Sequence, residues 1–294
     1  MKTKPTITIL GLIVFLAASF NLSAQSARDI MIKYDKVSKE ASFSLFQQTK
    51  LMTCKYTIQQ GKMRAAEKPR VSVLEMVSED DGVDNKDSRS VSMVIEPARD
   101  KGISMLTYTY AAPEKDDDNW VYLPALGKVK RLVSSSEGSD ESASFFGSEF
   151  SVEDMTSRKI DDYTYKLVEQ ADYANRPVWV LELLPTPERA KKSMYGKAVL
   201  WIDKERFIIL RQDLYDRNGL LFKRLTASNI EQIDKVWVAR KAEMNNLLTR
   251  RVTIMELISI AYNIEVPEGF LTQRTLTDFA YREKILGQLR SNLQ

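Results

Sequence analysis

The sequence predicts a mainly β protein with flanking helices, built around one antiparallel sheet. From Lys50 onward the chain alternates in periods of two, with Met52, Cys54 and Tyr56 on one side of the predicted strand. About a dozen further segments of strand length follow up to residue 257, separated by turn residues. No helical crossover lies between them, as parallel strands would require, so we expect antiparallel neighbours.

Two turns and two flanking helices complete this prediction. Asn218–Gly219 between apolar segments is a strong hairpin signal, and residues 203–206 indicate another tight connection. Residues 27–48 contain no glycine or proline and carry Ile30, Tyr34 and Val37 at helical spacing. Residues 275–292 also have helical composition. Their apolar face is predicted to contain Phe279, Ile285 and Leu289.

The first residues have the pattern of a secretory signal peptide. Lys2 and Lys4 precede an apolar run over residues 7–20, and Ala24 suits a cleavage site. We therefore expect a signal peptide at 1–24 and a single domain at 25–294, exported to the periplasm as a soluble protein. The apolar run is shorter than a spanning helix needs, although an uncleaved anchor remains an alternative. No cysteine follows the run, so a lipid anchor is not expected.

Composition excludes several functional classes. The chain has no histidine, which rules out Ser-His-Asp and Cys-His catalytic systems and the usual histidine-containing zinc sites. Cys54 is the single cysteine, so no disulfide forms within the chain. The formal charge of +3 includes Lys2 and Lys4 and falls to +1 without them, which gives no reason to expect nucleic acid as a partner. The acidic runs at 79–85 and 114–119 are typical of solvated turns.

One stretch does not fit the strand pattern. Residues 134–144 are rich in serine and acidic residues, and the sequence "SASFFGSEFSVEDM" at 142–155 adds three phenylalanines around a glycine. Ser151 and Asp154 have the spacing of a capping box before a short helical turn. Long loops in compact domains are often binding loops. A mobile apolar flap at the mouth of a cavity and a core plug beneath a surface loop both remain open here.

Several blocks of this chain resemble one known family. The blocks "NWVYLPALGKVKRL", "SFFGSEFSVEDM", "DDYTYKLV", "VWVLELLPTP" and "GKAVLWIDKERFIILRQDLYDRNGLL" are similar to the outer-membrane lipoprotein-sorting proteins, relatives of LolA, over roughly residues 28–271. The resemblance implies a strongly curved antiparallel half-barrel of the LolA/LolB type, with about 11–12 strands, whose apolar concave side is covered by helices.

The resemblance also implies a function. Such proteins take up acyl chains of lipoproteins or a phospholipid-like amphiphile and carry them through the periplasm toward the outer membrane. It implies transient membrane contact and an exporter of the resistance-nodulation-division (RND) type as partner, without catalysis, cofactor or metal. The missing anchor cysteine favours a soluble shuttle. An adaptor of such an exporter without its own lipid cargo is the main alternative, and a lipid-acting enzyme is a weaker one.

The candidate ligand-binding residues are apolar and aromatic. A carrier must enclose an acyl chain, because exposing each CH2 costs about 0.8 kcal/mol, and methionines and aromatics adapt to varied ligands. Each of these residues also has the simpler interpretation of closed core. The predicted cavity or flap residues are Met52, Tyr56, Trp120, Tyr122, Phe145, Phe146, Phe150, Trp179, Trp201 and Trp237.

Overall fold

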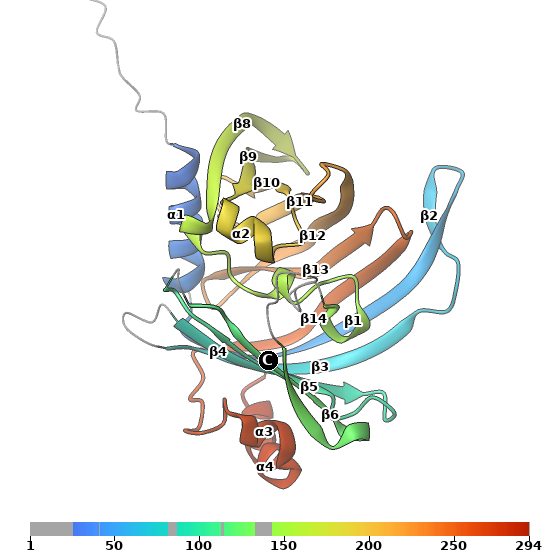
Figure 1. Cartoon of the computed structure of the whole chain (residues 1–294), viewed down its shortest axis with the longest axis vertical. Coiled ribbons are helices and arrows are strands. Elements are labelled where there is room, and N and C mark those ends of the chain that lie inside the picture. Colours follow the sequence, from blue (N-terminus) through green and yellow to red (C-terminus); the bar gives the residue numbers. More distant parts are fainter. Residues whose placement is uncertain (1–25, 41, 82–86, 113–114, 133–142, 294) are drawn as a thin grey trace, which may run out of the picture.

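The computed structural model describes residues 26–40, 42–81, 87–112, 115–132 and 143–293. Their strands form one 14-stranded antiparallel sheet in the order β7-β6-β5-β4-β3-β1-β14-β13-β12-β11-β10-β9-β8, with β2 paired to β1 alone. The sheet curves strongly and stays open, because β7 and β8 are its two edges and do not pair (Figure 1). The predicted mainly β half-barrel is therefore confirmed, with more strands than expected.

The strands follow one another along the chain mostly as hairpins. Their bounds are β1 Ser44–Gln59, β2 Lys62–Ala65, β3 Arg70–Asp81, β4 Asp87–Glu96, β5 Ser104–Thr109, β6 Asp118–Leu123, β7 Lys128–Leu132, β8 Tyr163–Tyr173, β9 Arg176–Pro185, β10 Lys197–Asp203, β11 Ile209–Tyr215, β12 Leu221–Ile233, β13 Val236–Asn246 and β14 Arg251–Tyr262. The exception to local pairing is β1, which lies between β3 and β14 and so joins the first half of the sheet to the last.

Both predicted turns are confirmed, and one strand was missed. Gly219, at φ +81°, lies in the β11–β12 hairpin, where the Asp216 carboxylate accepts hydrogen bonds from the backbone N–H groups of Asn218 and Leu220. Residues 203–206 connect β10 to β11. The short strand β2 is exposed along its whole length, so it has no apolar side that alternation would reveal.

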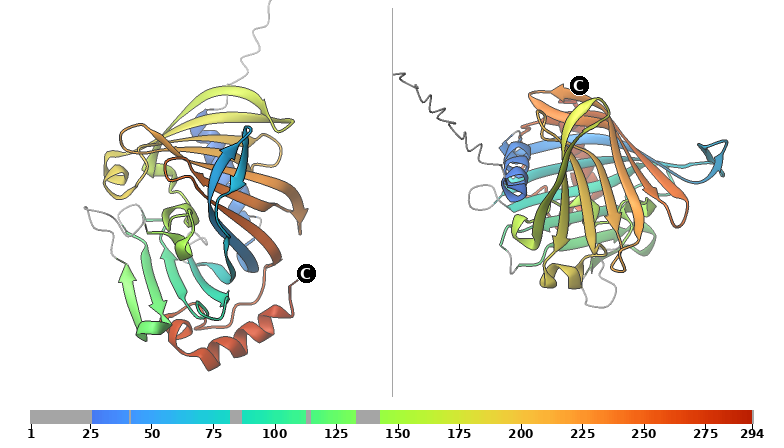
Figure 2. Two further views of the ribbon diagram at one scale, coloured as in Figure 1. Left: turned by 90° about the vertical axis from the view of Figure 1, so that its right-hand side faces the viewer. Right: turned by 90° about the horizontal axis from the view of Figure 1, so that it is seen from above.

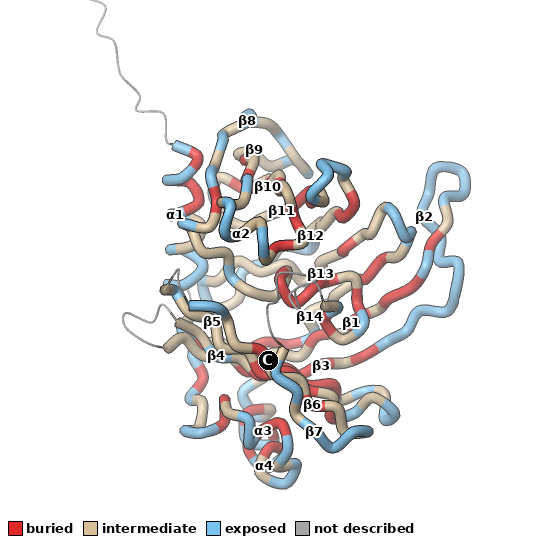
Figure 3. The backbone as a smooth tube through the Cα atoms, viewed as in Figure 1, coloured by how far each residue is buried: buried red, intermediate tan, exposed pale blue. Residues whose placement is uncertain are grey.

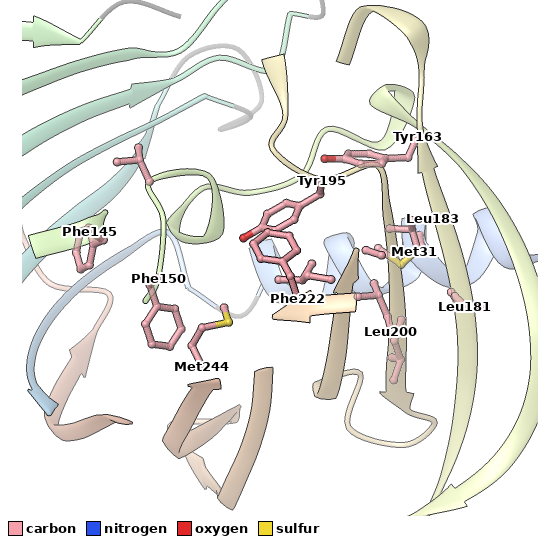
Figure 4. Packing of buried hydrophobic residues seen from close by; sticks show 14 of the residues in the cluster. Met31, Phe145, Phe150, Tyr163, Leu181, Leu183, Tyr195, Leu200, Phe222 and Met244 are labelled. Carbon is pink, nitrogen blue, oxygen red and sulfur yellow. The ribbon is translucent and has the colours of Figure 1, made fainter. Parts of the chain in front are cut away.

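The curved sheet has an apolar cluster on each face. The concave cluster collects side chains from both arms of the sheet, including Leu74 of β3, Leu200 of β10 and Met244 of β13. Figure 3 shows buried positions along strands of both arms, and Figure 4 shows the side chains of Leu200 and Met244. A second cluster contains Phe46, Val77 and other residues of the β1–β6 half, and lies on the convex face. Strand residues alternate between faces, so the strands β3 to β6, which contribute to both clusters, are covered on both faces.

The N-terminal helix α1 (Ala27–Glu40) covers one end of the concave side (Figure 2). Ile30 and Met31 are buried in the concave cluster, and Tyr34 packs against it. Val37, a predicted face residue, is exposed. The helix is shorter than the predicted 27–48, because β1 already begins at Ser44.

The C-terminal helices α3 (Gln273–Thr277) and α4 (Phe279–Arg290) pack on the convex face, below β5 and β6 in Figure 1. The covering helices therefore lie on both faces of the sheet, with α1 on the concave side and α3 and α4 on the convex side. The predicted helical tail is also interrupted at Asp278, whose carboxylate accepts from the backbone N–H of Tyr281 and caps α4. Ile285 and Leu289 are buried as predicted, whereas Phe279 is largely exposed.

A buried ion pair fixes α4 to the sheet. Arg290 donates from Nε and Nη2 to the two carboxylate oxygens of Glu75, at 2.7 and 2.8 Å. Glu75 lies in the middle of β3 and is 0% exposed. A bidentate pair of this kind is both strong and geometrically specific, so α4 is an integral part of the domain.

Three expectations fall on residues outside the described part. They are the signal peptide at 1–24, most of the serine-rich run at 134–144, and most of the acidic run at 79–85. Within the part of the chain that the structure describes, no helix is both long and apolar enough to cross a membrane.

Candidate functional site

The chain between β7 and β8 crosses the open side of the half-barrel. These two strands follow one another in sequence but form opposite edges of the sheet. The connection therefore has to pass from one arm to the other, and its described part, residues 143–162, lies inside the curve (Figure 2). We call residues 143–162 the crossing segment. It contains three short 3-10 helices, Phe145–Gly147, Glu153–Met155 and Ile160–Asp162.

The apolar side of the crossing segment fills part of the concave face. Phe145, Phe150 and Val152 are buried in the concave cluster, and Phe146 packs against it (Figure 4). The rings of Phe145 and Phe146 meet edge to face, with centroids 4.6 Å apart. This placement agrees with the core-plug alternative, since a flap at the mouth would expose its rings.

The backbone of the crossing segment makes a tight turn at its glycine. Phe146 has a left-handed conformation at φ 50°, which is uncommon and strained for a bulky residue. Gly147 follows at φ +74°, and a Cβ there would lie 2.4 Å from Nη1 of Arg70. The backbone angle therefore favours glycine, whereas the Arg70 guanidinium is the end of a flexible side chain that can shift.

Glu153 ties the crossing segment to the connection between β9 and β10. This connection contains helix α2 (Pro187–Lys192). The buried Glu153 carboxylate accepts from Nη2 of Arg189 at 2.6 Å, from the hydroxyl of Ser193 at 2.5 Å and from the backbone N–H of Met194 at 3.1 Å. A buried carboxylate with three donors is well stabilised, whereas its removal would leave the Arg189 charge without this partner.

Asp154 makes a second polar connection deeper in the structure. Its Oδ1 accepts from the hydroxyl of Tyr195 at 2.8 Å, and its Oδ2 accepts from the backbone N–H and the hydroxyl of Ser151, both at 2.8 Å. The backbone N–H of Asp154 donates back to the Ser151 hydroxyl, which confirms the predicted capping box. Burial, and then the neighbouring Asp154 charge, raise the pKa of Tyr195 well above its usual value, so this phenol stays a hydrogen-bond donor.

Glu149 connects the segment to the last strands of the sheet. Its carboxylate accepts from Nε of Arg251 at 2.7 Å and from Nδ2 of Asn246 at 2.9 Å. Its backbone N–H donates to the hydroxyl of Thr253 at 2.8 Å. Together with Glu153 and Asp154, it places a polar border around the buried phenylalanines.

A pocket of about 370 Å³ lies between the crossing segment and strands β12 to β14. This volume is within the usual range of roughly 300–1,000 Å³ for small-molecule sites. The pocket has an apolar wall, made by residues of the concave cluster, and a polar wall. Its lining residues are Ser144, Gly147, Ser148, Glu149, Phe150, Ser151, Met194, Phe222, Lys223, Asn246 and Arg251.

The structure brings four of the ten predicted site residues together. Phe145, Phe150, Phe146 and Trp179 all lie in or against the concave cluster. Trp120 and Tyr122 belong to the convex cluster below the C-terminal helices. Whether any of these residues binds a ligand stays a prediction.

The other four predicted residues lie elsewhere. Trp201 packs in a separate cluster with Val178, Val180 and Leu210, on a face away from the crossing segment. Tyr56 packs with Cys54 and Val252. Met52 and Trp237 are partly buried and belong to none of these clusters, and the Arg206 guanidinium lies 4.5 Å from the Trp237 ring.

Sequence reasoning missed the polar residues of the site. Glu149, Glu153 and Asp154 alternate with phenylalanine and valine in the crossing segment, which is a signal that this loop is partly buried. Their partners Arg189, Tyr195, Lys223 and Arg251 are far away in sequence and carry no local signal. Among the described residues, no group of three or more His, Cys, Asp or Glu side chains is arranged to hold a metal ion.

Known proteins resemble this chain in sequence and in fold. A protein-family model described as "-like: Uncharacterized protein" matches residues 86–278. A search of curated proteins found no match.

Three crystal structures share this fold. A protein domain from Vibrio parahaemolyticus, named for outer membrane lipoprotein sorting, is 26% identical with a TM-score of 0.72, over 85% of this chain and 98% of that one. A DUF1329 family protein from Desulfovibrio piger is also 26% identical, with a TM-score of 0.75 over 85% and 97% of the two chains. A LolA superfamily protein from Nitrosomonas europaea is 19% identical, with a TM-score of 0.62 over 84% and 97%, which shows the fold alone.

The open half-barrel and these structural relatives define a LolA-like protein. The chain belongs to the family whose model matches residues 86–278, and the predicted resemblance is confirmed.

Proposed function

We propose that this protein is a non-catalytic periplasmic carrier. Its concave face binds the acyl chains of lipoproteins or of a phospholipid-like amphiphile and moves them toward the outer membrane. The observation that carries the proposal is the concave cluster, which draws apolar side chains from both arms of an open sheet and is crossed by a separate segment.

The crossing segment provides a way to exchange cargo. Its phenylalanines lie on apolar surface of the concave cluster, where they can also pack against an acyl chain that enters the cluster. An acyl chain that displaces part of these contacts exchanges one apolar contact for another, so the net free energy of loading is small compared with about 0.8 kcal/mol for every CH2 removed from water. A small net free energy suits a shuttle, because the protein also has to release what it binds.

Two further observations support the proposal. The N-terminal residues have the pattern of an export signal, which supports a periplasmic location for the mature chain. One structural relative of 26% identity is named for outer membrane lipoprotein sorting.

The β1–β2 hairpin is the proposed site of transient membrane contact. It extends beyond the body of the sheet in Figure 1, and its cross-strand partners Ile58 and Met63 are exposed. Residues 55–70 contain five basic residues and one acidic residue. A basic surface with exposed apolar side chains favours an anionic lipid headgroup layer.

One observation favours the adaptor alternative. The concave cluster is already filled by the crossing segment, as expected for a protein that docks on an RND-type exporter without carrying lipid itself. In that case the crossing segment is permanent core and stays in place when lipid is present.

Photocrosslinking with a palmitate analogue that carries a terminal benzophenone tests the carrier function directly. We expect residues 25–294 to be labelled in the concave strands and in the crossing segment. The double variant Phe145→Ser/Phe146→Ser should retain less of the probe with the fold intact, whereas the outer-face control Trp201→Phe should retain as much as wild type. Unfolding of the double variant, together with an absence of labelling in wild type, would instead support the adaptor.

A further inference from the structure

A lysine is buried at the border between the pocket and the concave cluster. Lys223 lies on β12, directly across from Leu214 of β11, a member of the concave cluster. Residues directly opposite one another in an antiparallel pair lie on the same face of the sheet, so Lys223 faces the concave interior. Its side chain is only 6% exposed.

Among the described residues, the Lys223 ammonium lies 5.8 and 5.7 Å from the ring centres of Tyr195 and Phe222 and makes only long contacts with oxygen atoms. Its Nζ lies 3.4 Å from the hydroxyl of Tyr195 and 3.7 Å from Oδ2 of Asp154. Hydrogen bonds from nitrogen to oxygen are normally 2.7–3.2 Å long, and an ammonium group has three donors. A buried charge without short hydrogen bonds is costly, so this ammonium has unused capacity for an acceptor.

The nearby carboxylates are already occupied by other donors. Both oxygens of Asp154 accept short hydrogen bonds, from Tyr195 and from Ser151. Glu149 accepts from Arg251 and Asn246. Lys223 is thus the charged donor of the pocket lining whose contacts stay long.

The pocket joins this donor to an apolar wall. Phe150 and Phe222 line the pocket and belong to the concave cluster, and Met194 lines it and packs against the cluster. A ligand with an oxygen at one end and a hydrocarbon chain at the other could accept a hydrogen bond from Lys223 and pack its chain against the apolar wall.

We propose that this pocket binds the polar end of the cargo. Nζ of Lys223 donates to an acceptor oxygen at the head of an acyl chain, namely an ester or amide carbonyl, a carboxylate or a phosphate. The chain itself then enters the concave cluster. The inference rests on the carrier function proposed above and names the chemical group that the carrier recognises.

A competing explanation gives Lys223 a purely structural role as a counter-charge for Asp154. Two variants separate the explanations. Lys223→Met removes the donor and keeps the length of the side chain, whereas Asp154→Asn removes the counter-charge and leaves the ammonium in place. If Lys223 and Asp154 form a purely structural pair, both variants should lose similar amounts of ligand affinity, because either change breaks the same contact.

The experiment compares displacement of fluorescent N-phenylnaphthylamine, which has no oxygen, by palmitate, monopalmitoylglycerol and palmitoyl lysophosphatidylglycerol. We expect Lys223→Met to lower the affinity for the oxygen-bearing lipids by about 10- to 100-fold, which corresponds to the loss of one hydrogen bond to a charged group. Direct binding of N-phenylnaphthylamine should change less than about twofold. Asp154→Asn should change the affinities for the oxygen-bearing lipids and for N-phenylnaphthylamine by the same factor, because the Lys223 donor is still present.

The three lipids distinguish the sources of the oxygen. A loss confined to lysophosphatidylglycerol assigns the contact to phosphate, and a loss for monopalmitoylglycerol assigns it to the ester carbonyl. If both variants lose the same factor of affinity for every lipid and for N-phenylnaphthylamine, the proposal is overturned in favour of the structural pair. Wild-type protein that binds none of the lipids would overturn the carrier function itself, which is a separate outcome from normal lipid binding by Lys223→Met.

Discussion

Replacing Glu153 by glutamine should release the crossing segment without unfolding the sheet. The substitution keeps the size of the side chain and one carbonyl acceptor, but it removes the negative charge. The short contact with the Arg189 guanidinium then loses the carboxylate charge. The single amide oxygen can accept either from Arg189 and Ser193, which bond to Oε1 of Glu153, or from the Met194 backbone N–H, which bonds to Oε2.

The expected magnitude follows from these contacts. A hydrogen bond to a charged group contributes about 1.5–3 kcal/mol, and breaking a buried ion pair costs up to about 5 kcal/mol. Because the amide preserves part of the network, we expect a loss of about 2–3 kcal/mol. This loss raises the open population of the crossing segment roughly 30- to 150-fold, at about 1.4 kcal/mol for each factor of ten.

Hydrogen exchange measured by mass spectrometry reports this opening. The backbone N–H of Phe145 donates to the carbonyl of Phe150 at 2.8 Å, and that of Val152 donates to Ala143 at 2.9 Å. Both amides should exchange faster in the variant by the factor given above, while the amides of β9 to β13 stay protected.

Glu188→Gln is the matched control, because Glu188 lies nearby on α2 and pairs only with the exposed Lys191. It should leave exchange of the crossing segment unchanged. If Glu153→Gln speeds up amide exchange in the crossing segment and in the whole sheet together, the segment does not open separately from the core. If it changes nothing, the polar border does not hold the segment.

Two other predictions concern pH and membranes. Burial raises the pKa of Asp80 to about 6 from 3.8, so its ionisation destabilises the fold as pH rises from about 4 to 6. Asp80→Asn should stabilise the protein by about 1 kcal/mol at pH 7, after allowance for solvent screening, and by nothing at pH 4. Denaturation at the two pH values measures this difference, and a gain that is equal at both would contradict it. Ile58→Ser/Met63→Ser should reduce sedimentation with vesicles containing phosphatidylglycerol several-fold and leave the Tm within a few degrees, because both side chains are exposed. Wild-type protein that does not sediment with such vesicles would contradict the proposed membrane contact.

Alternation and turn chemistry predicted most of the sheet from sequence. The period of two in a strand such as β1 after Lys50 depends only on local residues, although Leu51 is buried on the face opposite to Cys54 and Tyr56. Strand β2 has no apolar side, because it extends into solvent as a hairpin. Its pairing with β1 is therefore absent from the hydrophobic pattern.

The faces of the aromatic residues were harder to predict. Trp179 and Trp201 occupy neighbouring strands with similar local sequences, yet Trp179 packs against the concave cluster and Trp201 packs in the outer one. Both faces of this sheet are covered over much of its area, so an apolar residue gives no information about its side. The face depends on register, and a bulge such as the one at Trp201/Ile202 changes it.

The crossing segment was recognised from its phenylalanines, but its attachment was not. Asp154 was predicted only as part of a helical cap with Ser151, and Glu153 was not predicted at all. Their main partners, Arg189 and Tyr195, come from the β9–β10 connection, which closes on the segment only after the sheet has curved. Long-range contacts of this kind are set by topology and leave no trace in a local pattern.

Mass spectrometry of the lipids bound to residues 25–294, purified gently from the periplasm, tests the carrier function most directly. We expect an acylated ligand at close to one molecule per protein, lost when the protein is delipidated and regained from added lipid. Protein that is free of lipid on isolation and also fails to take up acyl probes would contradict the account and leave the adaptor as the better explanation.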